Sequence, residues 1–334
     1  MANREDAENE EYERLKNSKF KQQKLPGWRP VPTITSTTII FFCFGAVFIV
    51  LGIIILVFSN KIEEVSFRYD DYCKDKKGND NPCEITIPIK NKMEKKVMVY
   101  YQLNGFYQNH RRYVKSKSDD QLNGKYISLQ EMKDSQDCDP AITNKDMGKK
   151  YSIVEEANGQ KKELEEEEVA IPCGLIAKSY FNDVFEDWKY KNPTKVKFNE
   201  DESEELFVNE KNIAWKADKE LKYKNVNREK QWIDMEDEHF IVWMRPAGLP
   251  NFRKLWGRID RQDLEAGSEV SLKIINNFDV SSFSGKKYII LSTVNAFGGK
   301  NTFLGISYIV LGGISIILAI VFIIGYNIHS KKNK

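Results

Sequence analysis

Two long apolar runs interrupt an otherwise polar chain. Residues Thr38–Phe58 and Phe303–Tyr326 contain no charged side chain. A helix rises about 1.5 Å per residue and the hydrocarbon core of a bilayer is about 30 Å thick, so roughly 20 apolar residues cross it. The pattern therefore predicts membrane-spanning helices over residues 34–59 and 303–328, although the mean hydropathy of the whole chain is −0.53.

The 60–302 segment between the runs has the pattern of a folded, β-rich domain. Val270, Leu272 and Ile274 alternate with more polar residues, as in a half-buried antiparallel strand. A three- and four-residue apolar spacing predicts one helix over Leu175–Phe185. The predicted strands are Ile85–Ile89, Val97–Leu103, Phe240–Met244, Val270–Phe278 and Tyr288–Val294. We expect an α+β domain of antiparallel sheets with a few helices.

Cations beside the two runs orient the chain in the membrane. Lys and Arg near a span tend to remain on the cytosolic side. They stand before the first run at Lys16, Lys19, Lys21, Lys24 and Arg29, and after the second at Lys331, Lys332 and Lys334. We therefore expect tails 1–33 and 329–334 to be cytosolic, and the domain at 60–302 to lie outside the cytosol.

Cysteine placement agrees with that topology. One of the five cysteines, Cys43, lies in the first run, and the other four lie in the domain: Cys73, Cys83, Cys138 and Cys173. An even number in an oxidising compartment predicts two disulfides. Three connectivities are possible, and we favour Cys73 with Cys83 and Cys138 with Cys173 because sequence neighbours close the smaller loops. With no Cys-x-x-Cys pair and few histidines, we expect no metal site.

Charge gives no sign of a polyanion partner. The tails hold 10 of the 51 cations and 6 of the 49 anions, so the domain carries 41 and 43. Nucleic-acid binding would need a clearly basic face. Two acidic runs, 163–168 and 200–205, lack the turn glycine of a calcium loop and are typical of solvated loops.

Motifs of enzyme chemistry are missing from the sequence. The three histidines form no zinc-binding pattern, and the sequence has no Gly-x-Ser-x-Gly elbow, P-loop or dinucleotide fingerprint. We expect a non-catalytic protein without a cofactor. The spans carry no ionisable residue, which disfavours an ion path within this chain.

Paired glycines mark both spans. Gly45 and Gly52 are seven residues apart, as are Gly305 and Gly312, so each pair shares a helix face. Small residues let another helix approach closely. Glycine is also common in membrane helices, so the pairs are either a packing face or ordinary composition.

Five blocks of the sequence resemble the ligand-effect modulator family, also called the cell division control protein 50 family. They are Phe20–Pro30, Tyr100–Ser116, Ile171–Asp183, Phe240–Ile259 and Gly298–Ile309. The resemblance implies an obligate heterodimer partner of a type-IV P-type ATPase that flips phosphatidylserine and related lipids. Members have no catalytic residues, escort the ATPase out of the endoplasmic reticulum and support its phosphoenzyme cycle.

Hypothetical interface residues follow from the aromatic and basic composition of these blocks. Internal packing is the alternative, and for Arg111 and Arg112 we favour partly buried ion pairs within the domain. For Trp28 by itself we favour the alternative that it belongs to an aromatic belt at the membrane surface. Together with the glycine pairs of the two spans, the candidates are Trp28, Gly45, Gly52, Phe106, Tyr107, Asn109, His110, Arg111, Arg112, Gly305 and Gly312.

The resemblance also implies a route from the endoplasmic reticulum to the Golgi, endosomes or plasma membrane. The terminal Lys331-Lys332-Asn333-Lys334 matches a dilysine retrieval pattern, although the positive-inside rule explains these lysines equally well. No Asn-x-Ser/Thr sequon without proline occurs, although many members of the resembled family are glycosylated. The rival hypotheses are a two-pass ion-channel subunit and a lipid-binding receptor.

Overall fold

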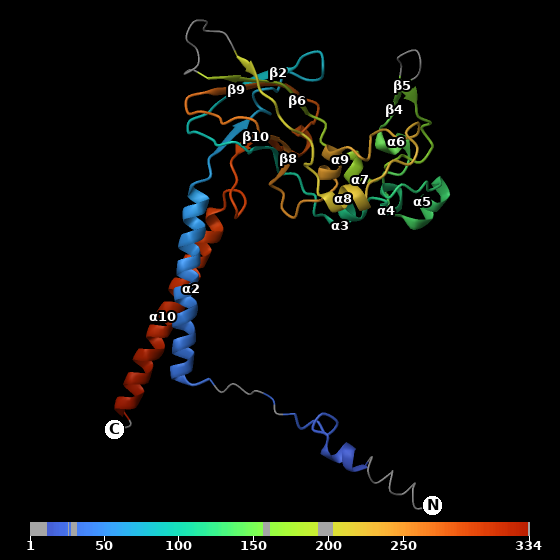
Figure 1. The fold of residues 1–334 in the computed structure, drawn as a ribbon. Coiled ribbons are helices and arrows are strands. Elements are labelled where there is room, and N and C mark those ends of the chain that lie inside the picture. The colour runs from blue at the N-terminus through green and yellow to red at the C-terminus, as the bar shows by residue number, and fades with distance from the viewer. Residues whose placement is uncertain (1–11, 26, 28–31, 156–160, 193–202, 333–334) are drawn as a thin grey trace, which may run out of the picture. The chain divides into compact units, whose positions relative to one another are not determined.

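The computed structural model describes residues 12–25, 27, 32–155, 161–192 and 203–332 (Figure 1). It forms two compact units, one from Met1–Leu56 with Phe303–Lys334 and one from Val57–Thr302. In the first unit, helices α2 (Ile34–Asn60) and α10 (Thr302–Lys332) are long and apolar enough to cross a membrane. Only 11% of the most apolar stretch of each is buried, which distinguishes them from core helices of a soluble protein.

The second unit, which we call the outer domain, contains two four-stranded antiparallel sheets and one small hairpin. The first sheet has the order β1 (Glu64–Arg68), β10 (Lys286–Ser292), β3 (Val97–Asn104) and β8 (Phe252–Ile259). The second has the order β2 (Cys83–Pro88), β9 (Glu269–Ile275), β6 (Val184–Lys191) and β7 (Glu204–Glu205). The hairpin pairs β4 (Tyr151–Glu155) with β5 (Lys161–Glu163).

The first and last strands of the domain are neighbours. β1 pairs with β10 from Glu64 opposite Ser292 to Arg68 opposite Tyr288. The chain therefore enters the domain from α2 and leaves it toward α10 at the same end of the same sheet.

Short helices gather beside the sheets (Figure 1). Several are fixed by side-chain caps, such as the capping boxes of Ser128 with Glu131 and Thr143 with Asp146. The helices are α3 (Arg111–Lys115), α4 (Asp119–Leu122), α5 (Leu129–Ser135), α6 (Asn144–Met147), α7 (Leu175–Lys178), α8 (Lys216–Leu221), α9 (Glu238–Trp243) and the 3-10 turn η1 (Ser281–Phe283).

Four predicted strands are confirmed as β2, β3, β9 and β10. The predicted alternation in β9 is also confirmed, because Val270, Leu272 and Ile274 are all buried. Two predictions were wrong. Phe240–Met244 lies in helix α9, and the helix expected over Leu175–Phe185 ends at Lys178, after which the chain forms strand β6.

A local cap and a buried lysine explain why α9 is helical. The Asp237 side chain accepts the Phe240 amide at the start of the helix. At its end, Lys254 Nζ donates to the carbonyls of Val242 (2.9 Å) and Trp243 (3.0 Å), as cations do at helix C-termini. Burial, together with the charge of Arg245, lowers the pKa of Lys254 to about 7. These contacts outweigh the strand preference of the Phe-Ile-Val run.

A buried ion pair links the two sheets. Lys287 Nζ from β10 donates to Asp183 Oδ2 at 2.6 Å, and both side chains are at least 98% buried. Asp183, just before β6, also accepts the Tyr69 hydroxyl (2.7 Å) and the Asn277 and Phe278 amides (2.6 Å each). Burial lowers the pKa of Lys287, an effect that the Asp183 carboxylate opposes. Every one of these charged and polar groups is hydrogen-bonded, as buried charges require.

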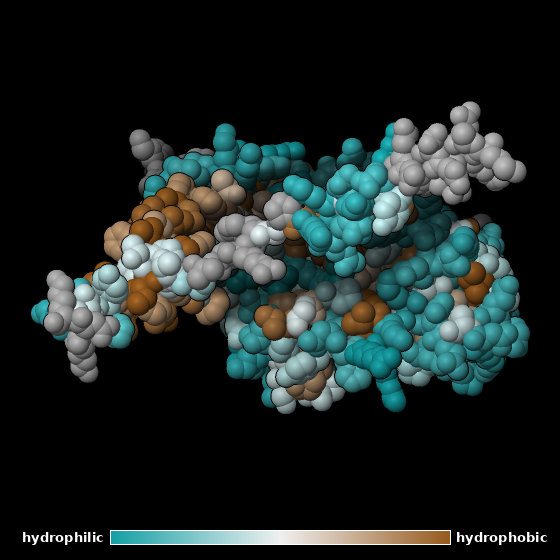
Figure 2. Space-filling view, turned by 90° about the horizontal axis from the view of Figure 1, so that it is seen from below, coloured by the Kyte–Doolittle hydropathy of each residue, from teal (hydrophilic) through white to brown (hydrophobic). Residues whose placement is uncertain are grey.

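Two disulfides staple the domain. Cys73 pairs with Cys83 and Cys138 pairs with Cys173, which is the connectivity that sequence proximity favoured. Figure 2 shows hydrophobic residues concentrated over the long helices, whereas the visible surface of the outer domain is mostly hydrophilic with isolated hydrophobic side chains.

Candidate partner interface

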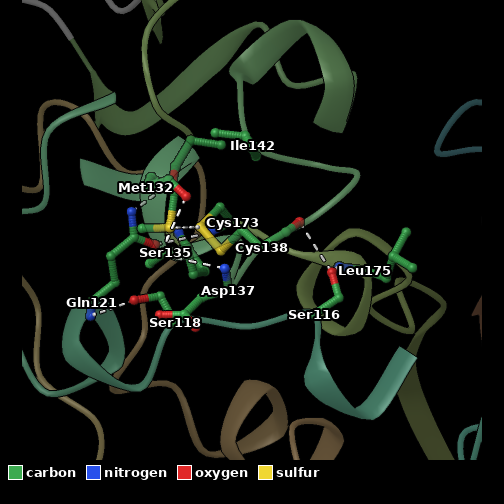
Figure 3. Close-up of a disulfide and its surroundings, with 12 residues drawn as sticks. Ser116, Ser118, Gln121, Met132, Ser135, Asp137, Cys138, Ile142, Cys173 and Leu175 are labelled. Carbon is green, nitrogen blue, oxygen red and sulfur yellow. Dashed lines mark hydrogen bonds between the residues drawn. A yellow bond between two sulfur atoms is a disulfide. The ribbon is translucent and has the colours of Figure 1, made fainter. Parts of the chain in front are cut away.

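The Cys138–Cys173 disulfide anchors the end of helix α3 (Figure 3). Ser116, the residue after α3, is buried, and its hydroxyl donates to the Cys138 carbonyl at 3.1 Å. The same hydroxyl accepts the Leu175 amide at 2.8 Å, at the start of α7. Ser116 thus connects α3 to both halves of the disulfide, and the position of α3 depends on this bridge.

A glycine after the second cysteine permits this contact. Gly174 has a φ of 99°, a conformation that L side chains rarely adopt. A Cβ placed on it would lie 2.2 Å from the Ser116 carbonyl oxygen. Only glycine fits, so the local sequence Cys173-Gly174 brings the backbone of α7 against the end of α3.

The opposite end of α3 is fixed by Phe106 and Gln108. The Phe106 ring contacts the rings of Trp243 (centroids 5.8 Å apart) and Phe283 (5.4 Å). Gln108 is fully buried, and its Oε1 accepts the Ala247 amide at 2.9 Å. Asn109 Nδ2 donates to the Gly248 carbonyl at 2.9 Å. Both were predicted as interface residues: the half-buried Phe106 packs inside the domain, and Asn109, although exposed, ties the segment to the Gly248 backbone.

The remaining predicted residues of this segment face solvent. The Tyr107 side chain is 65% exposed, and His110, Arg111 and Arg112 are exposed as well. The expectation of partly buried ion pairs for Arg111 and Arg112 was wrong, because neither has an ion-pair partner among the residues that the structure describes. The reason is that Tyr113 is the α3 residue that points inward: its hydroxyl bonds Ser179 Oγ at 2.7 Å, and burial raises its pKa.

A hollow of about 840 Å³ lies beside this cationic turn. His110, Arg112 and Lys115 line it from the α3 side, and Asp137 and Asp139 line it from the chain around Cys138. Together with exposed Tyr107, the hollow provides aromatic, cationic and anionic contacts on one preformed surface. We refer to Tyr107, His110, Arg111, Arg112 and Lys115 as the α3 surface.

Helix α8 adds an exposed aromatic residue that sequence reasoning missed. Trp215 is 67% exposed, and the Arg245 guanidinium stacks 4.7 Å from the centre of its ring. Arg245 Nε also donates to buried Asp218 at 2.6 Å, which lowers the pKa of that carboxyl despite its burial. The exposure of Trp215 could not be predicted from the sequence, because it depends on how α8 packs against α9.

The four predicted glycines lie against one another within the chain. A Cβ on Gly45 would be 2.9 Å from the Gly312 carbonyl oxygen, and a Cβ on Gly52 would be 2.9 Å from the Gly305 carbonyl oxygen. All four are buried. These two glycine faces are therefore occupied by each other within the same chain.

Two predicted features lie outside this surface. Trp28 and the last residues of the Lys331–Lys334 pattern are outside the described residues. Among the residues that are described, no group of three or more His, Cys, Asp or Glu side chains is arranged to hold a metal ion.

Comparison with known proteins places the chain in a family. The LEM3 (ligand-effect modulator 3) family / CDC50 family profile matches residues 55–332. Putative ALA-interacting subunit 4 of Arabidopsis thaliana is 38% identical, with 93% of this chain and 89% of the relative covered. Cell cycle control protein 50A of Mus musculus is 37% identical, with 92% and 88% covered. The chain belongs to the LEM3/CDC50 family.

Proposed function

We propose that this chain is the non-catalytic accessory subunit of a phospholipid-translocating P-type ATPase, a flippase. The observation that carries the proposal is the match, over most of both chains, to relatives named as interacting subunits. Two membrane-length helices around a stapled outer domain suit a subunit that remains beside a membrane-embedded partner.

In this role the chain forms a heterodimer with the catalytic subunit, with both tails in the cytosol and residues 60–302 on the other side of the membrane. The chain escorts the ATPase out of the endoplasmic reticulum, stabilises it and supports its transport cycle at the Golgi, endosomes or plasma membrane. The paired spans pack beside the helices of the ATPase, and the outer domain covers its extracytosolic loops.

The α3 surface is the proposed contact within the outer domain. Exposed arginines and tyrosines are enriched at interaction sites because they combine large contact area with directed hydrogen bonds. Arg111 and Arg112 have no ion-pair partner among the described residues, so they can pair with carboxylates of another chain. The disulfide and Gln108 hold this surface in one conformation before binding, which lowers the entropic cost of association.

Co-purification from membranes tests the assignment. A tagged chain should recover a P-type ATPase, and its deletion should reduce uptake of fluorescent phosphatidylserine. Recovery of the chain without any such ATPase, together with unchanged lipid uptake in the deletion strain, would exclude the function.

A double variant tests the contact surface. Arg111→Gln with Arg112→Gln should lower the recovered ATPase severalfold, because hot-spot arginines each contribute roughly 1–2 kcal/mol or more to binding. Lys76→Gln with Lys77→Gln removes the same charge from an exposed turn near the other disulfide and is the matched control. Equal ATPase recovery with both variants would exclude the α3 surface and leave the subunit assignment intact.

A further inference from the structure

A second hollow, of about 460 Å³, lies where the chain enters and leaves the outer domain. Phe58, in the last turn of α2, and Lys61, just after that helix, line one side. Thr293 and Asn295 line it from the segment before α10. Lys95 and Lys96, from the turn before β3, complete its rim. We refer to it as the foot hollow.

Chain connectivity places the foot hollow at the membrane surface. Phe58 is the last residue of the uncharged apolar run, and Lys61 follows three residues later. Three residues span at most about 10 Å, which is comparable to the headgroup layer of a bilayer. Asn295 Nδ2 donates to the Phe58 carbonyl at 2.8 Å, so the segment before α10 is held beside the end of the apolar run.

Hydrogen bonds and an aromatic pair keep the walls in place. The Glu63 amide donates to Thr293 Oγ1 at 3.0 Å, and the Thr293 amide donates to the Glu63 carbonyl at 2.9 Å. The Phe58 and Phe297 rings lie 5.1 Å apart, and Phe297 is 62% exposed. Exposed aromatic rings at this depth suit the boundary between acyl chains and headgroups.

Three ammonium groups of the foot hollow can bind a ligand phosphate, although that of Lys61 also lies 5.7 Å from the centre of the Phe58 ring. Lys92 is already paired with Asp263 (3.2 Å) and Glu265 (2.9 Å). By contrast, Lys61, Lys95 and Lys96 are exposed and form no ion pair with any described residue.

Two carboxylates accompany these cations. Glu63 accepts a hydrogen bond from Asn91 Nδ2 at 3.0 Å and keeps acceptor capacity, because a carboxylate has about four lone-pair sites. Glu94 is exposed and directly precedes Lys95 in the sequence. The hollow thus combines cationic and anionic groups a few residues from the hydrocarbon core.

We propose that the foot hollow binds the headgroup of a phospholipid of the extracytosolic leaflet, one that carries both a phosphodiester and an ammonium group. Lys61, Lys95 and Lys96 contact the phosphate, and Glu63 and Glu94 contact the ammonium. The acyl chains extend past Phe58 and Phe297 into the bilayer. This site goes beyond the accessory role above and requires only that the chain span a membrane, so it is tested on the chain without the ATPase.

Native mass spectrometry of the full-length chain in mild detergent provides the test. The probes are phosphatidylethanolamine, phosphatidylglycerol, which has the phosphate without the ammonium, and diacylglycerol, which has neither. We expect retention in that order. Lys61→Gln with Lys95→Gln and Lys96→Gln should reduce phosphatidylethanolamine retention about tenfold or more, since the charge-assisted hydrogen bonds from three ammonium groups to the phosphate are lost. Lys74→Gln with Lys76→Gln and Lys77→Gln, a matched triple on another exposed turn, should leave it unchanged.

A carboxylate variant separates the two halves of the headgroup. Glu63→Gln with Glu94→Gln should reduce phosphatidylethanolamine retention and leave phosphatidylglycerol retention equal or higher. Soluble glycerophosphoethanolamine should compete weakly, because it lacks the acyl chains. Equal retention of diacylglycerol, full competition by the soluble headgroup, or no effect of the lysine triple would overturn the proposal. A lysine triple that loses the ATPase while lipid retention is unchanged would make the hollow a protein contact and overturn it as well.

Discussion

The backbones of Gly45 and Gly312 are in direct contact. A Cβ on Gly45 would lie 2.9 Å from the Gly312 carbonyl oxygen, and a Cβ on Gly312 would lie 2.8 Å from the Gly45 carbonyl oxygen. The contact is reciprocal, and it repeats seven residues along each helix between Gly52 and Gly305. In a membrane, such close approach replaces the hydrophobic effect as the source of helix association.

Gly45→Leu should therefore destabilise the purified full-length chain. The added side chain meets Gly312 backbone and the Ile316 side chain, and overpacking of this kind costs about 1–3 kcal/mol. Gly313→Leu is the control, because a Cβ at Gly313 meets no atom within 4 Å. Thermal unfolding in detergent should show a lower midpoint for the first variant only. Equal midpoints would mean that the spans do not pack through these glycines.

Removing the Cys138–Cys173 disulfide should expose helix α3 to protease. This bridge closes a 35-residue separation, and in the chain-entropy model such a loop is worth about 4 kcal/mol. In the double variant Cys138→Ser with Cys173→Ser, Ser116 loses a fixed partner, so trypsin should cleave after Arg111 or Arg112 much faster. Cys73→Ser with Cys83→Ser removes a 10-residue staple elsewhere and should leave cleavage at these sites near the wild-type rate. Similar cleavage in both variants would disprove the anchoring role.

Lys287→Met should be strongly destabilising. It leaves the Asp183 carboxylate buried without its cation, and breaking a buried pair in this way costs about 3–5 kcal/mol. Lys273→Met, which breaks the exposed pair with Asp187, should change the free energy of unfolding little. Denaturant unfolding of the two variants measures the difference, and equal effects would show that the buried network is not what joins the sheets.

Asp218 should make stability depend on pH in the acidic range. Its hydrogen bond to Arg245 lowers its pKa below the ordinary value of 3.8. As the pH falls, Asp218 is therefore protonated in the unfolded chain before it is protonated in the folded chain. Its contribution to the free energy of unfolding is complete above about pH 5 and is lost as the pH falls through the folded-state pKa. The melting-temperature difference between wild type and Asp218→Asn should be constant from pH 7 to 5 and should shrink below pH 4. A difference that does not change with pH would contradict this pairing.

Sequence patterns predicted an element correctly where its environment shows directly in the spacing of its apolar residues. The uncharged runs predicted α2 and α10 by their length and lack of charge. Alternation predicted strands such as β9, because one face of such a strand is buried. Strand β8 was missed for a physical reason. Lys254 occupies a buried position of this strand, so the sequence does not show a clean alternation of apolar and polar residues. The lysine is there to cap helix α9, which the sequence pattern had predicted as a strand.

The candidate interface was predicted only in part. The block around Phe106 stood out by composition, but composition does not say which side chains point inward. Arg111 and Arg112 face solvent because Tyr113 takes the inward position of a single helical turn. Likewise, the apolar spacing of Leu175–Phe185 fitted a helix, yet Asp183 is required by the buried network and Val184 pairs with Ile275 in a sheet.

The pairing of β1 with β10 has a mechanical consequence. Glu64 and Ser292, the strand residues nearest the two spans, lie opposite each other at the end of the ladder. A force that pulls the spans apart would therefore peel these hydrogen bonds one at a time, which is much weaker than shearing them together. The glycine contacts between α2 and α10 bear such a force first, so the packing of the two helices protects the β1–β10 hydrogen bonds from being broken in sequence.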